Sequence, residues 1–436
     1  MIDSSPRCAV RTRGSSARRV VVAGIVVLLF LLLATLIVRG GRPNSRAAYD
    51  EQTYHLPTIR QFQHQWPHID FSDYASATTP GYHLAIAMAG RALHAGPATL
   101  RWIGAAFTIG LLATLAIAVG RRAGPGTTIV LCLPVVCSLY VLSSGVWLLP
   151  DNAGWWGVLG VLLIALRPRV DRWTYWLGGT AVLALVMVRQ IDLWVAAPLC
   201  AAAWLGEASP RGAALIEPSR GGVRRLISML LALVPALAAL GYFFQLWHGM
   251  APPQQQRLVG GGNPAAPATA LAVIGGFGLF YAGYVWSGMT QNVGRTVGWA
   301  LAGAACGALV GVLPCTVYDE VAGRFSGVWN LARHLPYVCG RSPLLVALSI
   351  IGGAVVAIWL AALPVRDRII CAVAAVAFLV AQAAGHYAFQ RYYEPLVLMA
   401  AAVTVVRVKE SPVRWAPLGP LLLAALLGAI TAKTLF

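Results

Sequence analysis

The chain has 436 residues, of which 58% are hydrophobic and 11% are charged. Soluble domains carry roughly 25% charged residues, so a soluble core of this length cannot hide the apolar surface and lipid must cover it. The formal net charge of +18 suggests a nucleic-acid partner. We reject one because the basic residues stand in ones and twos between apolar runs, as topology-determining charges do.

The first apolar run, Val20 to Val38, follows a cluster of arginines: Arg7, Arg11, Arg13, Arg18 and Arg19. Its length of about 19 residues suits a membrane span, whereas a signal peptide has an apolar region of roughly 7–15 residues. No small-x-small cleavage site ends the run. We therefore predict a first span with a cytoplasmic N-terminus.

Hydropathy and arginine clusters extend this pattern to an all-α, polytopic membrane protein with about thirteen transmembrane helices in one domain, residues 1–436. The predicted spans are about 20–38, 99–119, 127–148, 153–166, 173–188, 192–205, 226–247, 267–287, 296–313, 343–363, 369–385, 395–406 and 415–434. The external loops are then 39–98, 248–266 and 314–342. Within the first loop, 81–96 is predicted to be an amphipathic helix at the outer interface.

The eight cysteines give little chemistry. Most lie inside apolar runs and are expected to be small core residues. Cys315 and Cys339 share one external loop, and an oxidising compartment would allow them to form a disulfide; the sequence leaves this open. No cysteine spacing indicates zinc, and no cofactor is indicated.

Asp50 and Glu51 open the first external loop, about a dozen residues after the first span. A carboxylate near lipid is costly, so it is usually paired or functional. At the membrane surface it could act as a general base toward a sugar hydroxyl. In an α-helix Glu51 would share a face with His55. The alternative is that the acidic pair only caps an interfacial helix.

The other candidates follow in chain order on the predicted outer side. Each has a structural alternative: a turn for the Pro-Gly-Tyr segment, a helix cap for the isolated aspartate, and an ion pair or an interfacial anchor for the arginines. Together they supply carboxylates for base chemistry and arginines suited to phosphate. They are Tyr82, Asp151, Arg189, Gln190, Arg324, Arg391 and Tyr392.

With these candidate residues in this order along the sequence, the chain resembles the class C glycosyltransferases, which use polyprenyl- or dolichyl-phosphate sugars. More specifically, it resembles the dolichyl-phosphate-glucose alpha-1,2-glucosyltransferase family. The matching segments are YDEQTYHLPTIRQF (49–62), TTPGYHL (78–84), LLPDNAGWW (148–156), MVRQIDLW (187–194), FQLWHG (244–249), GRFSGVWNLAR (323–333) and QRYYEPLV (390–397). The richness in Ala, Gly and Arg is typical of a GC-rich bacterial genome, so a bacterial plasma membrane is expected.

The resemblance implies an inverting transfer of a hexose, glucose in the family, to a glycan or lipid-linked acceptor on the extracytoplasmic face. Asp50 would be the general base or would orient the acceptor hydroxyl, and Glu51 would support it or bind sugar. Arg391 and Arg189, with Arg324 as a third, would hold the donor phosphate. Asp151, His55, Tyr82, Gln190 and Tyr392 would complete the substrate site. Some enzymes of this class depend on a divalent metal, but nothing in the sequence demands one.

Two other functions stay open. A flippase or transporter of lipid-linked glycans would show charges deep within spans and often internal repeats; the sequence has few such charges and no visible repeat. A polymerase, ligase or protein O-glycosyltransferase on the same scaffold would differ only in the acceptor or the sugar.

Overall fold

The structure is a computed structural model that describes residues 14–41, 45–207, 220–408 and 411–436. In these ranges the regular secondary structure is helical. The loops contain two isolated β-bridges, Asp319 with Arg324 and Val338 with Arg341. The predicted all-α class is confirmed. Arg7, Arg11 and Arg13, which supported the cytoplasmic N-terminus, lie outside the described residues.

The first half of the chain forms α1 (Gly14–Gly40), α2 (Arg46–Asp50), η1 (Glu51–His55), α3 (Leu56–Gln65), α4 (Gly81–Ala92), α5 (Pro97–Gly120), α6 (Pro125–Cys137), α7 (Leu139–Val146), α8 (Asp151–Ala165), α9 (Arg172–Val188), η2 (Gln190–Val195) and α10 (Ala196–Leu205). The second half forms α11 (Arg220–Trp247), α12 (Pro253–Val259), α13 (Ala266–Gly278), η3 (Leu279–Tyr284), α14 (Trp286–Gln291), α15 (Val293–Val312), α16 (Val328–Ala332), α17 (Pro343–Ala362), α18 (Val365–Ala383), η4 (Gln390–Tyr392), α19 (Glu394–Val405) and α20 (Leu418–Leu435).

Among the described residues, seven helices are long and apolar enough to cross a membrane. They are α1, α5, α11, α13 continued by η3, α15, α17 and α20. The helices α6 and α7 make an eighth candidate if they count as one broken span, bent by 69° at Ser138. The chain therefore has the helices of a multi-pass membrane protein.

The predicted count of about thirteen spans is not reached. The predicted spans 153–166, 173–188, 192–205 and 395–406 fall on α8, α9, the η2–α10 pair and α19. The longest of these helices, α9, has 17 residues, or about 26 Å at 1.5 Å per residue, against a hydrocarbon core of about 30 Å. The fifth, 369–385, falls on α18, which carries three charges in its first turn. Hydropathy does not separate a short buried helix from a span.

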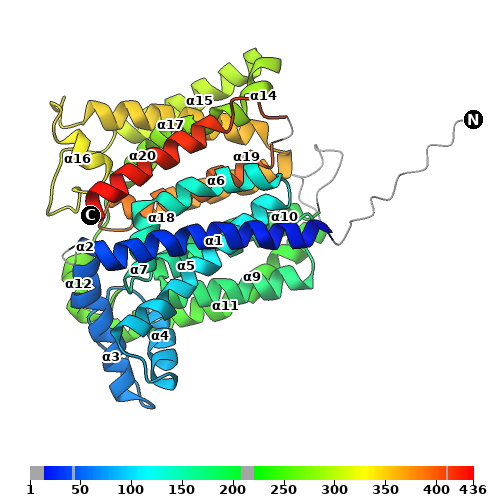
Figure 1. Cartoon of the computed structure of the whole chain (residues 1–436). Helices are drawn as coiled ribbons and strands as arrows, with labels where there is room; N and C mark the ends of the chain where they lie inside the picture. The colour runs from blue at the N-terminus through cyan, green and yellow to red at the C-terminus, as the bar shows by residue number, and fades with distance from the viewer. Residues whose placement is uncertain (1–13, 42–44, 208–219, 409–410) are drawn as a thin grey trace, which may run out of the picture.

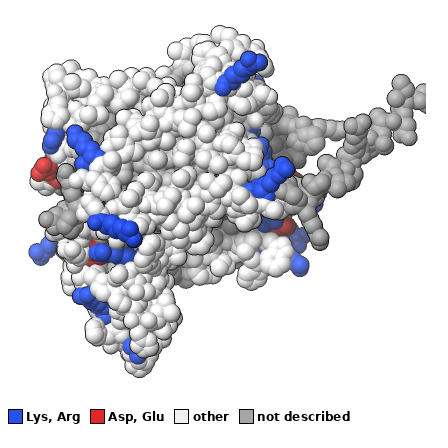
Figure 2. All heavy atoms as spheres, viewed as in Figure 1, with Lys and Arg blue, Asp and Glu red and all other residues white. Residues whose placement is uncertain are grey.

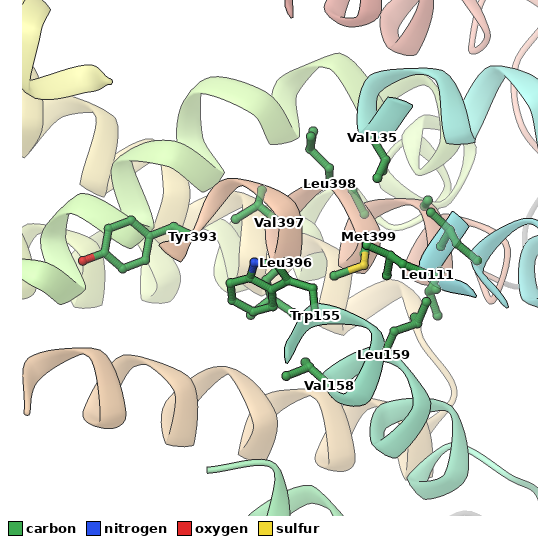
Figure 3. Packing of buried hydrophobic residues seen from close by; sticks show 14 of the residues in the cluster. Leu111, Val135, Trp155, Val158, Leu159, Tyr393, Leu396, Val397, Leu398 and Met399 are labelled. Atoms are coloured by element: carbon green, nitrogen blue, oxygen red, sulfur yellow. The ribbon is translucent and has the colours of Figure 1, made fainter. Parts of the chain in front are cut away.

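The shortest of these segments lie in the centre of the protein. In α19 nearly every residue is buried, from Glu394 to Val405. Figure 3 shows Leu396 to Met399 of this helix packed beside Trp155 and Leu159 of α8. The longer helices surround this centre (Figure 1) and expose apolar side chains such as Leu231 and Leu301, each 65% exposed.

Charged side chains avoid the middle of the face seen in Figure 2. On the face in Figure 2, Lys and Arg lie toward the two ends and a pale band separates them. At one end, Arg407 pairs with Asp367 at 2.7 Å, and Arg366 donates to the carbonyls of Gly206 and Ala165. The ends of α8, α10 and α19 and the start of α18 thus meet there. This distribution suits a protein whose middle faces lipid.

The first loop forms helices at the other end, where α2, α3 and α4 lie beyond the bundle (Figure 1). The segments α2, η1 and α3 run on continuously, since the residues at both joints, Glu51 and Leu56, have α-helical backbone angles. Ser45 caps the start of α2 by accepting from the amide of Ala48. The predicted helix at 81–96 is present as α4, which ends at Ala92.

Candidate functional site

A cavity of about 370 Å³ lies at the end of the bundle that carries α2. Pockets for small ligands usually measure about 300–1,000 Å³. Its wall comes from segments far apart in the sequence: α2 with η1, residues 76–78, the start of α8, Arg189, α12, residues 320–325 and residues 387–392. Six predicted site residues line it, namely Asp50, His55, Asp151, Arg189, Arg391 and Tyr392.

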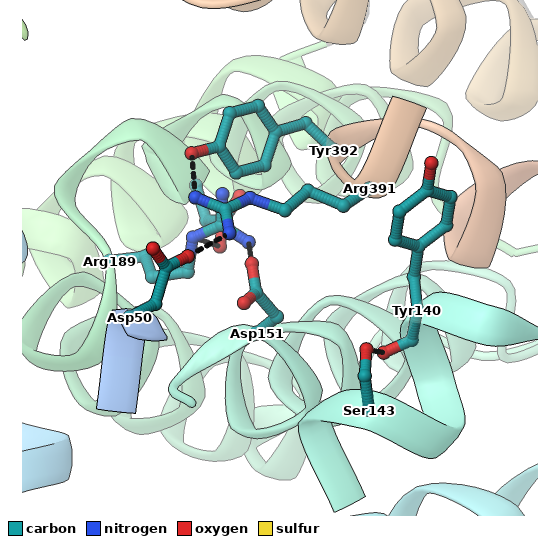
Figure 4. Close-up of polar contacts among 8 residues, drawn as sticks. Asp50, Tyr140, Ser143, Asp151, Arg189, Arg391 and Tyr392 are labelled. Carbon is teal, nitrogen blue, oxygen red and sulfur yellow. Dashed lines mark hydrogen bonds and ion pairs between the residues drawn. The ribbon is translucent and has the colours of Figure 1, made fainter. Parts of the chain in front are cut away.

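Asp50 and Arg391 form the closest ion pair of the cavity. Arg391 Nη1 lies 2.6 Å from Asp50 Oδ2, and Arg391 Nη2 donates to the hydroxyl of Tyr392 at 3.0 Å (Figure 4). The two residues are 341 positions apart. Burial alone would lower the pKa of Arg391, but the neighbouring Tyr392, Asp151 and Asp50 raise it, so the guanidinium stays charged.

A second pair lies beside the first. Arg189 Nη1 is 3.4 Å from Asp151 Oδ1, and both side chains are buried (Figure 4). Arg189 breaks the helical path between α9 and η2 with an extended backbone, and its guanidinium lies 5.2 Å from the ring centroid of Tyr392. Gly154 leaves room for it, because a Cβ there would be 2.9 Å from Arg189 Cδ. Asp151, in the first turn of α8, is favoured by the helix dipole.

A π-helical turn decides which residues of the first loop face the cavity. Pro57 has no amide hydrogen to donate into the preceding turn, and the amide of Leu56 instead bonds to the carbonyl of Glu51, five residues back. A turn closed over five residues brings Asp50 and His55 to one side, and both line the cavity. The expected shared face of Glu51 and His55 therefore does not form, since Glu51 does not line it.

Glu51 turns toward α5 instead. Both of its carboxylate oxygens accept from Arg101, at 2.6–3.0 Å, and Oε2 also accepts from the amide of Leu148 at 2.9 Å. Glu51 is 1% exposed. It ties the first loop to the bundle directly behind Asp50, which fits the supporting role better than contact with a substrate.

His55 is buried at the inner edge of the cavity. Burial and the charge of Arg391 lower the pKa of its imidazole to about 3, so the ring is neutral. Its Nδ1 lies 2.9 Å from Nε2 of His83 on α4. Burial also lowers the pKa of His83 well below its usual range. One neutral ring therefore donates to the other.

Besides Glu51, three predicted site residues lie away from the cavity wall. Tyr82 is buried in α4, where burial raises the pKa of its hydroxyl. Gln190 joins three loops, since it donates to the carbonyls of Ala77 and Met250 and accepts from the amide of Thr79. Arg324 donates to the carbonyl of Cys315 and to Asn263. Their roles as substrate ligands stay predictions.

The cavity also contains residues that the sequence analysis missed. They include Arg46, Tyr49, Tyr54, Phe325 and Phe389. The guanidinium of Arg46 stacks on the ring of Phe325, 4.1 Å from its centroid. Arg46 and Asp50 are four residues apart, which is about one helical turn. This spacing could have indicated that Arg46 lies beside Asp50 in the site.

In the described part of the chain, no group of three or more His, Cys, Asp or Glu residues is placed to hold a metal ion. The arrangement offers a carboxylate to accept a proton and guanidinium groups to bind an anion, all within one cavity. Comparison with protein-family models, curated proteins and solved structures finds no match to this chain, so the geometry of this cavity carries the functional argument.

Proposed function

We propose that the protein is an integral membrane glycosyltransferase that moves a hexose from a polyprenyl-phosphate donor to a glycan or lipid-linked acceptor. One observation carries the proposal. A single cavity at one end of an apolar helical bundle holds Asp50 paired with Arg391 and Asp151 paired with Arg189. The resemblance to the class C glycosyltransferases and their fold belongs to the same proposal, as does glucose as the sugar.

The reaction needs one base and one anion site. The acceptor hydroxyl attacks the anomeric carbon and forms the new glycosidic bond, while Asp50 takes the hydroxyl proton. The bond from the anomeric carbon to the phosphate oxygen breaks, and its electron pair leaves with polyprenyl phosphate. Because the phosphate is already a stabilised anion, the leaving group needs no general acid. A single displacement inverts the anomeric configuration.

Arg391 links the two halves of this reaction. Before the donor binds, it holds Asp50 at 2.6 Å. The donor phosphate offers the guanidinium a second anionic partner, to which charge-assisted hydrogen bonds form. Charge on the leaving phosphate then develops beside a fixed cation, which stabilises the transition state. The ion pair of Arg189 and Asp151 lies in the same cavity as Arg391. The Arg189 guanidinium lies 5.2 Å from the centroid of the Tyr392 ring.

The orientation is part of the proposal. Both α8 and α19 begin beside the cavity, at Asp151 and Glu394, and end at the cluster of Arg366 and Arg407. Cytoplasmic loops of membrane proteins carry an excess of arginine and lysine. With that cluster inside, the cavity faces the extracytoplasmic side of a bacterial plasma membrane, where lipid-linked sugars are used.

The test uses the purified full-length protein in lipid nanodiscs with radiolabelled polyprenyl-phosphate hexose and a crude lipid extract. Transfer of label to a product defined by mass spectrometry is expected, and Asp50→Asn should lower the rate at least 100-fold, within the range of about 10²–10⁴ for a general base. Asp70→Asn is the matched control, because Asp70 is in the same loop and outside the cavity wall.

Wild-type transfer by Asp50→Asn would remove Asp50 from the mechanism. Movement of labelled donor across the bilayer without formation of a new bond would replace the proposal with a flippase.

A further inference from the structure

Arg46 lies at the boundary between two cavities. Beside the larger cavity is a second one of about 110 Å³. Both are lined by Arg46, Asp151, Phe389 and Arg391. A group placed between these four side chains would therefore reach into both spaces.

The charge of Arg46 is not balanced by a carboxylate. Arg391 is paired with Asp50 and Arg189 with Asp151, whereas Arg46 makes no ion pair in the described ranges. Its contacts are aromatic: the guanidinium lies 4.1 Å from the centroid of Phe325 and 5.4 Å from that of Phe389. Rings against the flat face hold the group in place and leave the N–H donors at its edge free for an anion.

Glu320 lines the larger cavity without an ion pair among the described residues. It is not part of the second cavity, whereas Arg46 is. In the second cavity the acidic residue is Asp151, which already pairs with Arg189. The side chains that line both cavities thus include two arginines: Arg46, which has no ion pair in the described ranges, and Arg391, which pairs with Asp50.

The second cavity lies beside membrane-crossing helices. Its wall includes Leu139, Tyr140 and Ser143 of α7, half of the broken span, and Thr434 and Leu435 at the end of α20. Figure 1 shows the end of α20 close to α2 and α7. This wall combines apolar side chains with hydroxyls, which suits the part of a lipid chain that follows a phosphate.

We propose that Arg46, together with Arg391, binds the donor phosphate, with the sugar in the larger cavity and the first part of the polyprenyl chain in the second. This assignment rests on the proposed function. It gives a role to an arginine that has no carboxylate partner among the described residues and lines both a polar cavity and a cavity beside the membrane helices.

Direct binding tests the assignment without turnover. Native mass spectrometry of the full-length protein would measure the affinity for polyprenyl phosphate, for the uncharged polyprenol of equal length and for inorganic phosphate. We expect Arg46→Ala to weaken polyprenyl-phosphate binding at least tenfold, because a hydrogen bond to a charged group is lost. Polyprenol binding should not change, and Arg46→Lys should recover part of the loss.

Arg60→Ala is the matched control, because Arg60 is exposed on α3 and lines neither cavity. Arg46→Gln keeps the size of the side chain if the alanine variant does not fold. Unchanged polyprenyl-phosphate binding in folded Arg46 variants would overturn the inference alone. Equal binding of polyprenyl phosphate and polyprenol by the wild type would overturn the proposed function with it. Binding of inorganic phosphate as tight as that of polyprenyl phosphate would remove the lipid from the assignment.

Discussion

At the scale of single residues, Asp50 and Glu51 are neighbours whose carboxylates have different partners. Asp50 faces the cavity and Arg391, while Glu51 accepts from Arg101 and from the amide of Leu148. Breaking a buried ion pair by removing one partner costs about 3–5 kcal/mol. Here Arg101 is 36% exposed, so water can take over part of the lost interaction and the lower end applies.

Glu51→Ala should therefore lower the stability of the folded protein by about 3 kcal/mol, whereas Asp50→Asn should lower transfer and cost less stability, because the amide oxygen of the new side chain can still accept from Arg391. Scanning fluorimetry of the two purified variants measures the difference in melting temperature, and the transfer assay measures the difference in activity, with Asp70→Asn as the control. If Glu51→Ala keeps the wild-type melting temperature and loses transfer, Glu51 takes part in the chemistry itself.

Sequence reasoning predicted the residue types of the site and six members of the cavity wall. It did not separate Asp50 from Glu51 by direction, because the direction depends on a π-helical turn that Pro57 favours. It also missed Arg46, whose proposed role depends on having no ion pair among the described residues, and a sequence does not show which distant side chains come within ion-pair distance.

At the scale of elements, the buried pair of His55 and His83 joins η1 to α4. Burial lowers the pKa of His55 to about 3 and that of His83 well below 6.5. An unfolded chain binds protons at both rings below about pH 6.5, whereas the folded protein does not. Stability is therefore fully present above pH 6.5 and falls as the pH drops toward 3.

The expected loss between pH 6.5 and pH 5 is about 2 kcal/mol for His55, from about 1.4 kcal/mol per pH unit, and His83 adds a loss in the same direction. Melting temperatures measured from pH 8 to pH 5 should show a steep decrease for the wild type. The double variant His55→Asn with His83→Gln should melt lower at pH 8 and depend less on pH. An equal pH dependence in the double variant would mean that other groups titrate.

The sequence predicted the helix α4 correctly but assigned several short central helices to the membrane. The helix predicted at 81–96 is present as α4, since Pro80 and Gly81 mark its start. The short central helices were predicted as spans because their residues are apolar throughout. Burial inside a bundle and burial in lipid select the same side chains, so the length of the helix, and not its composition, makes the difference for α8 and α19.

At the scale of the whole molecule, the distribution of arginine predicts which end faces the cytoplasm. The cluster around Arg366 and Arg407 lies at the far ends of α8 and α19, and residues 314–342 follow the end of α15. The sequence alone placed 314–342 outside. The structure adds two exposed free thiols there, Cys315 and Cys339, which give native reporters of the orientation.

In a variant that otherwise has no cysteine, Cys315 should react with a membrane-impermeant maleimide in intact bacterial cells. Arg121→Cys in the same background, at an exposed position after α5, should react only after the cells are permeabilised. The opposite pattern would place the cavity in the cytoplasm and exclude the orientation on which the donor argument depends. With both Cys315 and Cys339 present, labelling that requires a reductant would show that these two residues form the disulfide that the sequence leaves open, because a disulfide removes both thiols from reaction with the maleimide.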